Sequence, residues 1–261
     1  MEFSDSSDVT VVITSCGRFN LLKKTLDSFF QYNTYPINKI IITEDSGDDK
    51  ILSVIPEKFK KYFNIIINKT KLGQIKSIDK AYNLVETDYI FHCEDDWEFY
   101  RSEFIEDSKK ILKNDKEIFQ VWLRSYYHDV KNNVNLHFQG PRKIIDDIPT
   151  YKVVSEDPNW HGFSFNPGLR RLSDYRKIKG GYYGLFKAGS SAAATESNIS
   201  SYVHNSGQYA VILENDAVAH IGDGQHVLSN HQKRKKTIRK IRELLTVTLL
   251  IIISFLLGTL I

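Results

Sequence analysis

Three acidic residues in succession stand directly after a short apolar segment near the middle of the chain. Glu94, Asp95 and Asp96 follow residues 89–93 (YIFHC). Adjacent carboxylates repel one another unless a positive charge neutralises them. A hard divalent cation such as Mn²⁺ or Mg²⁺ does so through oxygen ligands, and it can also bind a diphosphate. The alternative is a solvated turn whose carboxylates cap the helix expected near residue 102.

Two further polar clusters follow apolar segments nearer the N-terminus. Their members are Thr14, Ser15 and Arg18 (in TSCGR) and Glu44 and Asp45 (in TEDSG). In an open parallel sheet, ligands bind where the carboxyl ends of the strands meet. If the preceding apolar segments are strands of one sheet, all three clusters converge on one edge.

The apolar pattern predicts an alternation of strands and helices that would position these clusters. Runs rich in β-branched residues predict strands at 9–14, 39–43, 64–68, 89–93 and 118–123. Helical spacing of apolar residues predicts helices at 19–31, 50–61, 74–85 and 102–114. The alternation predicts an α/β fold with a mostly parallel sheet flanked by helices on both faces.

The second half is less regular. Gly, Pro, Asn and aromatic residues from 125 to about 190 indicate hairpins and loops, followed by a helix near 196–205 and a strand near 210–213. We see no linker before about residue 225 and no internal repeat. The sequence therefore predicts one domain over residues 1–225.

Composition limits the class of protein. The chain is 41% hydrophobic and 26% charged, which is typical of a globular protein. Its net charge is +3, and residues 233–243 hold seven basic side chains and one acidic, or +6, so the rest carries 3 − 6 = −3. A mildly acidic body argues against a nucleic-acid partner. Two cysteines, Cys16 and Cys93, are too few for a disulfide framework and indicate a reducing compartment.

The C-terminal segment predicts a membrane anchor. Residues 244–261 are 18 uncharged, mostly apolar residues, which as a helix would span roughly 27 Å. A buried or amphipathic helix is the alternative, but the segment has no polar face. Residues 226–243 form a basic juxtamembrane segment, which predicts a cytosolic catalytic domain by the positive-inside rule. The short acidic N-terminus has no apolar region and predicts no signal peptide.

From residue 8 to 222 the chain resembles the family 2 glycosyltransferases, which have the GT-A fold. The resemblance rests on VVITSCGRFNLLKKTLDSF, on IIITEDSGD, on LGQIKSIDKAYNLVETDYIFHCEDDWEF and on TESNISSYVHNSGQYAVILENDAVAHIG. Each piece is a weak signal alone, but four pieces in order at matching spacing are specific. The resemblance implies a GT-A Rossmann-like domain that binds a nucleotide-diphosphate sugar.

The resemblance also implies roles in the first half. Thr14, Ser15 and Arg18 would line the nucleotide pocket, and Glu44 and Asp45 would contact the base or ribose. Glu94 and Asp96 would take the outer positions of the Asp-x-Asp metal motif, with Asp95 beside the nucleotide sugar.

Two departures from the family pattern fall in this half. The first acidic position of the metal motif is Glu94 rather than Asp, a conservative change for metal binding. Ile78-Asp79 replaces the Arg-Asn pair common in the family, which leaves Lys76 and Asp79 as candidates for phosphate or ribose contact.

The second half would supply a base and further phosphate ligands. Glu196 fits the first acidic position of the family's acidic pair, where a carboxylate deprotonates the acceptor; the alternative is stabilisation of a helix N-terminus. His220 would bind the metal or the diphosphate. The remaining candidates are Arg170 and Arg171 for the diphosphate, and Glu214 and Asp216 as less well placed carboxylates.

The expected function is an inverting, metal-dependent transfer of a sugar, with a UDP-sugar as donor and a glycan, lipid-linked or protein acceptor. A metal-dependent nucleotidyltransferase is a rival, but the first turn has only Gly17 and Arg18 where such enzymes carry a glycine-rich basic loop. An inactive membrane-tethered protein that binds nucleotide sugars is another, which the presence of Glu94, Asp96 and Glu196 argues against.

Overall fold

The computed structural model describes residues 1–131, 137–187 and 192–225, together with residues 238, 242 and 246. Residues Met1–Gly222 form one compact unit, and Asp223–Ile261 form a second. The predicted juxtamembrane segment and anchor lie almost entirely outside the described residues. Within the described part, no helix has the length and apolar character needed to cross a membrane.

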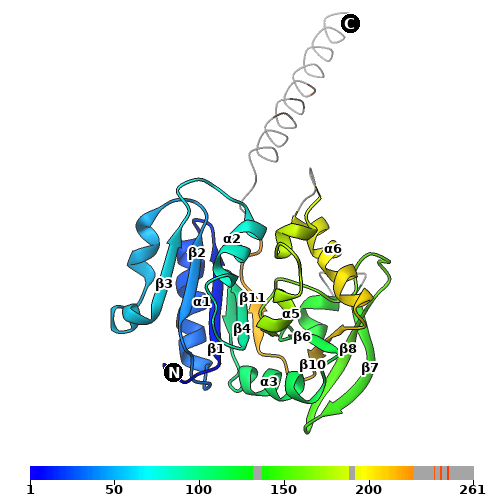
Figure 1. Ribbon diagram of the computed structural model, residues 1–261. Coiled ribbons are helices and arrows are strands. Elements are labelled where there is room, and N and C mark those ends of the chain that lie inside the picture. Colours follow the sequence, from blue (N-terminus) through cyan, green and yellow to red (C-terminus); the bar gives the residue numbers. More distant parts are fainter. Residues whose placement is uncertain (132–136, 188–191, 226–237, 239–241, 243–245, 247–261) are drawn as a thin grey trace, which may run out of the picture. The chain divides into compact units, whose positions relative to one another are not determined.

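A five-stranded sheet forms the centre of the first unit (Figure 1). Its order is β3 (Phe63–Ile67), β2 (Ile40–Glu44), β1 (Val9–Ser15), β4 (Tyr89–Glu94) and β9 (Gly168–Arg171). The first four strands are parallel, as the sequence predicts, and β9 is antiparallel to β4.

The remaining strands form two smaller sheets. One has the order β6 (Ile118–Trp122), β10 (Tyr209–Leu213), β8 (Ile148–Ser155) and β7 (His137–Ile145), and the other pairs β11 (Val218–His220) with β5 (Trp97–Phe99). The fifth predicted strand thus exists as β6, but it does not extend the central sheet. Because β9 already pairs with the free edge of β4, β6 pairs with β10 instead.

The helices largely match their predicted ranges. They are α1 (Phe19–Tyr32), α2 (Gln74–Tyr82), α3 (Phe104–Asn114), α5 (Leu172–Arg176) and α6 (Ala192–Asn205), with short turns η1 (Asp49–Val54), η2 (Glu57–Tyr62), η3 (Tyr126–Val130) and η4 (Tyr182–Leu185). The helix predicted at 50–61 is wrong, since two 3₁₀ turns occupy that range. Pro56 separates them because it holds the preceding Ile55 in an extended conformation.

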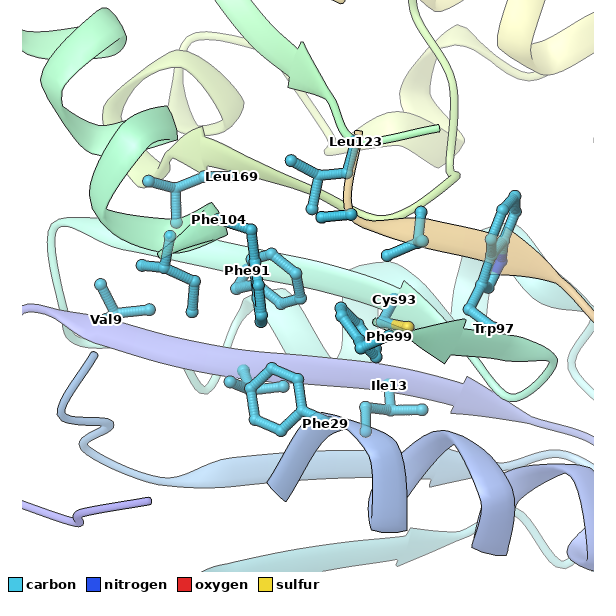
Figure 2. Close-up of a cluster of buried hydrophobic side chains, with 14 of the residues drawn as sticks. Val9, Ile13, Phe29, Phe91, Cys93, Trp97, Phe99, Phe104, Leu123 and Leu169 are labelled. Carbon is cyan, nitrogen blue, oxygen red and sulfur yellow. The ribbon is translucent and has the colours of Figure 1, made fainter. Parts of the chain in front are cut away.

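Both faces of the central sheet are covered, which explains the continuous apolar strands. In β4, Phe91 and Cys93 face a core shared with α1 and α3, whereas Ile90 faces a second core shared with α2 and α6. Figure 2 shows the first core, where the Phe29 and Phe99 rings meet edge to face at 5.2 Å. This double packing fixes the sheet, so its carboxyl edge is a rigid platform for the turns that leave it.

Candidate active site

The turn after β1 is held to the turn after β2 by a buried carboxylate. Glu44 is fully buried. It accepts hydrogen bonds from the Ser15 hydroxyl (2.7 Å), the Gly17 backbone N–H (3.0 Å) and the Ser46 backbone N–H (2.7 Å). Gly17 turns with φ +74°, a conformation that favours glycine. Glu44 and Ser15, both predicted to bind the nucleotide, therefore shape the two turns that would surround it.

Asp45 holds the segment that enters α2. Its carboxylate accepts from the backbone N–H groups of Leu72 and Gly73, both at 2.8 Å, and from the Asn68 side-chain amide at 3.0 Å. Gly73 stands at the N-cap with φ +84°, which again favours glycine. The acidic pair thus organises three neighbouring turns through backbone donors.

Arg18 joins the first turn to the acidic triplet. Its guanidinium donates from Nη1 to Asp96 Oδ2 at 2.6 Å and from Nη2 to Asp95 Oδ1. Burial raises the pKa of Asp95 to about 6 despite the opposing charge of Arg18. Burial would also raise the pKa of Asp96, but hydrogen bonds and charge from His220 and Arg18 lower it below the usual value. The pKa values of the two adjacent aspartates are therefore shifted in opposite directions, and Asp96 is the more readily ionised of the two.

His220 lies far from Asp96 in the sequence but beside it in the fold. Strand β11 pairs with β5 so that His220 stands opposite Trp97, and His220 Nε2 lies 3.2 Å from Asp96 Oδ2. The backbone N–H of Ile221 donates to the Asp96 carbonyl at 2.9 Å. A Cβ on Gly222 would lie only 2.2 Å from Asp96 Oδ2. The chain therefore needs glycine there to approach the carboxylate.

The donor set of this corner fits a divalent cation. A carboxylate oxygen and an imidazole nitrogen lie close together here, and both bind divalent first-row metal ions such as Mn²⁺. Within the described residues, no group of three or more His, Cys, Asp or Glu side chains is arranged to hold a metal. Asp96 and His220 would thus supply two ligands and leave the other positions to a diphosphate and water.

Glu94 faces the same edge, but its pKa is shifted in the opposite direction from that of Asp96. Burial, followed by the charges of Asp96 and Glu196, raises the pKa of Glu94 to about 8. Gln74 donates to Glu94 Oε1 at 2.8 Å from the first turn of α2. Glu94 is therefore harder to ionise than an exposed glutamate, and a cation beside it would favour its ionised form.

Glu196 lies within electrostatic range of Glu94, on the N-terminal half of α6. Its Oε1 accepts from the Phe165 backbone N–H at 2.8 Å. Burial raises the pKa of Glu196 above its usual value, and this hydrogen bond opposes the shift. A carboxylate with a raised pKa is a stronger proton acceptor once it is ionised, which suits a general base.

The two other carboxylates considered as bases have partners elsewhere. Glu214 accepts from Arg142 Nε at 2.7 Å and from the Tyr151 hydroxyl at 2.8 Å, and these hydrogen bonds lower its pKa to about 2. Asp216 accepts from the Tyr100 hydroxyl. A carboxylate with so low a pKa is a weak base, so Glu214 is poorly suited to the task.

Two of the predicted binding residues make hydrogen bonds within the protein. The Asp79 carboxylate accepts from the Tyr175 hydroxyl (2.9 Å) and from the backbone N–H groups of Tyr182 (2.9 Å) and Tyr183 (2.8 Å), which anchors η4. Arg170 is 3% exposed and donates to the Tyr82 hydroxyl at 3.0 Å.

Arg171 stands opposite Tyr89, the first residue of β4, far along the strand from Glu94. It donates to the backbone carbonyls of Ile118, Leu112 and Asp115. With Arg170 it lines a separate cavity of about 350 Å³ that also includes Asp174 and Tyr202. The structure therefore does not place this arginine pair as a diphosphate clamp beside Asp96.

Two other predicted binding residues lie near the same turns. Thr14 stands in register with Thr43 and Glu94 at the ends of β1, β2 and β4, and it is 9% exposed. Lys76 is exposed on the first turn of α2, with Nζ 4.5 Å from the centre of the Tyr183 ring. Both lie beside the turns that Glu44 and Asp45 organise.

Some site residues were missed in the sequence. Gln74 contacts Glu94, Gly222 abuts Asp96, and the Arg124 guanidinium lies 5.3 Å from the Trp97 ring centre. Arg124 is in turn held by Asp129 through two 2.7 Å hydrogen bonds. Nothing in the sequence near Gly222 or Arg124 signals these contacts, because they depend on how β11 and η3 return to the acidic triplet.

Comparison with known proteins bears on the family and the fold of the chain. The model of the family described as "Glycosyl transferase family 2" matches residues 10–174. Among solved structures, the mannosyltransferase PcManGT from Pyrobaculum calidifontis, in complex with GDP-Man and Mn²⁺, superposes with a TM-score of 0.60 at 13% identity, covering 85% of this chain and 60% of that one.

Two structures of residues 1–349 of TarS from S. aureus are also similar. One superposes with a TM-score of 0.54 at 13% identity, and the other, in complex with UDP, with a TM-score of 0.54 at 11% identity; each match covers 84% of this chain and 60% of TarS. The chain thus spans about 60% of the solved structures it matches. No curated protein matches the sequence.

The fold is that of the nucleotide-sugar-dependent glycosyltransferases of GT-A type. The chain belongs to glycosyl transferase family 2, because the family model covers 165 of its 261 residues (10–174). The resemblance to this family that the sequence shows is confirmed over residues 10–174.

Replacing Gly222 by alanine tests the corner around Asp96. The added Cβ must displace the carboxylate from His220, so binding of Mn²⁺ together with UDP or GDP should weaken by about 10- to 100-fold, as for residues that orient a metal ligand. Calorimetric titration measures this. Gly207→Ala is the control, since nothing lies within 4 Å of a Cβ there and φ is +79°; it should lower stability without changing binding. Unchanged binding in Gly222→Ala would contradict the described corner.

Proposed function

We propose that this protein transfers a sugar from a nucleotide-diphosphate sugar, with UDP as the expected nucleotide, to an acceptor hydroxyl with inversion at the anomeric carbon. The observation that carries the proposal is the convergence of Glu94, Asp96, His220 and Glu196 on one edge of the sheet. These residues come from β4, the turn that follows it, β11 and α6. The complexes of PcManGT with GDP-Man and of TarS with UDP support a nucleotide-sugar donor.

A divalent cation, Mn²⁺ or Mg²⁺, would be held by Asp96 and His220, with Glu94 nearby. When bound, it would neutralise the charge that develops on the diphosphate leaving group. The Mn²⁺ in the PcManGT complex supports this part of the proposal. The turns ordered by Glu44 and Asp45 would bind the nucleotide beside Thr14 and Lys76.

Glu196 would act as the general base. Its carboxylate takes the proton of the acceptor hydroxyl while the acceptor oxygen forms a bond to the anomeric carbon. The bond between that carbon and the diphosphate oxygen breaks, and its electron pair leaves with the diphosphate. The Phe165 N–H fixes the orientation of the carboxylate at 2.8 Å. A single displacement of this kind inverts the anomeric centre.

Substituting Asp96 by alanine should abolish Mn²⁺-dependent nucleotide binding while the domain stays folded, because the proposed carboxylate ligand of the cation is lost. A thermal-shift assay with UDP or GDP, with and without MnCl₂, shows this as loss of the metal-dependent increase in Tm. Glu98→Ala is the matched control, since Glu98 lies two residues away and is exposed. A metal-dependent shift that persists in Asp96→Ala would exclude Asp96 as the ligand.

Substituting Glu196 by glutamine should lower turnover by about 10²- to 10⁴-fold, the range for loss of a general base. Donor binding should remain, since the amide oxygen can still accept from the Phe165 N–H. Initial rates and nucleotide titrations measure the two effects, with Glu214→Gln as the control. Donor affinity that falls as much as the rate would assign Glu196 to binding, and NMR of the product must show inverted configuration.

Membrane attachment is a further part of the proposal. Residues 244–261 would span the bilayer, and the basic residues of 233–243 would lie on the cytosolic side with the catalytic domain. Such an anchor suits an acceptor at the membrane surface, such as a lipid-linked one. In sealed cytosol-side-out vesicles, added protease should digest the catalytic domain. Protection of the domain would reverse this topology.

A further inference from the structure

Arg18 makes contacts that its assignment to the nucleotide pocket does not explain. Its guanidinium bonds to both Asp95 and Asp96, whose side chains are 1% and 6% exposed. Two adjacent buried carboxylates require a counter-charge, and a forked guanidinium supplies it through two separate N–H groups. The side chain of Arg18 is itself 19% exposed, so it reaches inward from the rim of the site.

The oxygen that Arg18 contacts is the one that faces His220. Arg18 Nη1 lies 2.6 Å from Asp96 Oδ2, and His220 Nε2 lies 3.2 Å from the same atom. A cation held between Asp96 and His220 would lie close to this oxygen, because His220 faces it. It would meet a positive charge already within hydrogen-bond distance, so cation and guanidinium compete.

We propose that Arg18 is an internal counter-ion that competes with the divalent cation for Asp96, and that cation binding transfers its guanidinium to the diphosphate of the nucleotide. The inference rests on the proposed function, since it takes Asp96 as a metal ligand. It makes Arg18 a positioning residue that links two binding events.

The physical consequence is that binding of the cation and binding of the nucleotide are coupled. The cation alone must break the contact of Arg18 with Asp96 and leave a cationic side chain beside a second positive charge. A diphosphate offers that guanidinium new oxygen acceptors in a geometry that suits its fork. Each ligand therefore strengthens binding of the other by the same factor.

The test measures Mn²⁺ binding without nucleotide, by electron paramagnetic resonance of free Mn²⁺ in titrations of the full chain. Arg18→Gln removes the competitor, so it should bind Mn²⁺ about tenfold more tightly than the wild type, within the usual range of such couplings. Saturating UDP or GDP should tighten Mn²⁺ binding less in the variant than in the wild type. Circular dichroism checks that the variant is folded.

Two controls separate contact from general charge. Lys71 interacts with Cys16 beside the same turns, so Lys71→Gln removes one positive charge from this edge without removing the Arg18 fork. It should change Mn²⁺ affinity much less than Arg18→Gln does. Arg18→Lys keeps the charge but not the fork, and its affinity should fall between those of the wild type and Arg18→Gln.

The outcomes distinguish the inference from the proposed function. Equal or weaker Mn²⁺ binding in Arg18→Gln, or equal tightening in Lys71→Gln, would overturn the role of Arg18 and leave the metal site intact. Absence of Mn²⁺ binding in every form, even with UDP or GDP present, would overturn the metal-dependent function and the inference with it.

Discussion

Four carboxylates are buried at one edge of the central sheet, and each must find donors or a counter-ion within the protein. Glu44, Asp45, Asp95 and Asp96 are each 5% exposed or less. An ionised carboxylate removed from water is strongly destabilising unless it is hydrogen-bonded or paired. The turns that leave β1, β2 and β4 take conformations that supply these partners, so the shape of the site follows from this constraint.

The four carboxylates are satisfied in two different ways. Glu44 and Asp45 accept mostly from backbone N–H groups, which are fixed by the chain and cannot leave. Asp95 and Asp96 depend mainly on the side chain of Arg18, which can rotate away. The first pair is therefore suited to a permanent structural role, and the second pair is suited to exchange one positive partner for another.

The proposed catalytic residues also differ in how far they are constrained. Asp96 is enclosed by Arg18, His220 and the close approach of Gly222. Glu196 is oriented by the loop that contains Phe165, and its charge contributes to the raised pKa of Glu94. The acidic triplet and the proposed base thus influence one another through charge, although they belong to distant parts of the sequence.

The sequence by itself determined the parallel strands, most of the helices and the acidic clusters at the strand ends. These features are local, since strand and helix periods can be read from neighbouring residues, and the edge of a parallel sheet follows from strand direction. Two strand pairings could not be read from local sequence, because they join distant segments: β9 pairs with the edge of β4 in the central sheet, and β6 pairs with β10 in a smaller sheet.

Tertiary structure alone decided which candidate side chains are available. Asp79 and Arg171 have the right chemistry for a nucleotide site, but they anchor η4 and the start of β6 because donors and carbonyls from remote segments surround them. Likewise, Arg18 meets Asp95 and Asp96 only after β1 and β4 pair in register. A sequence shows which groups a chain carries, whereas their partners depend on contacts between segments far apart along it.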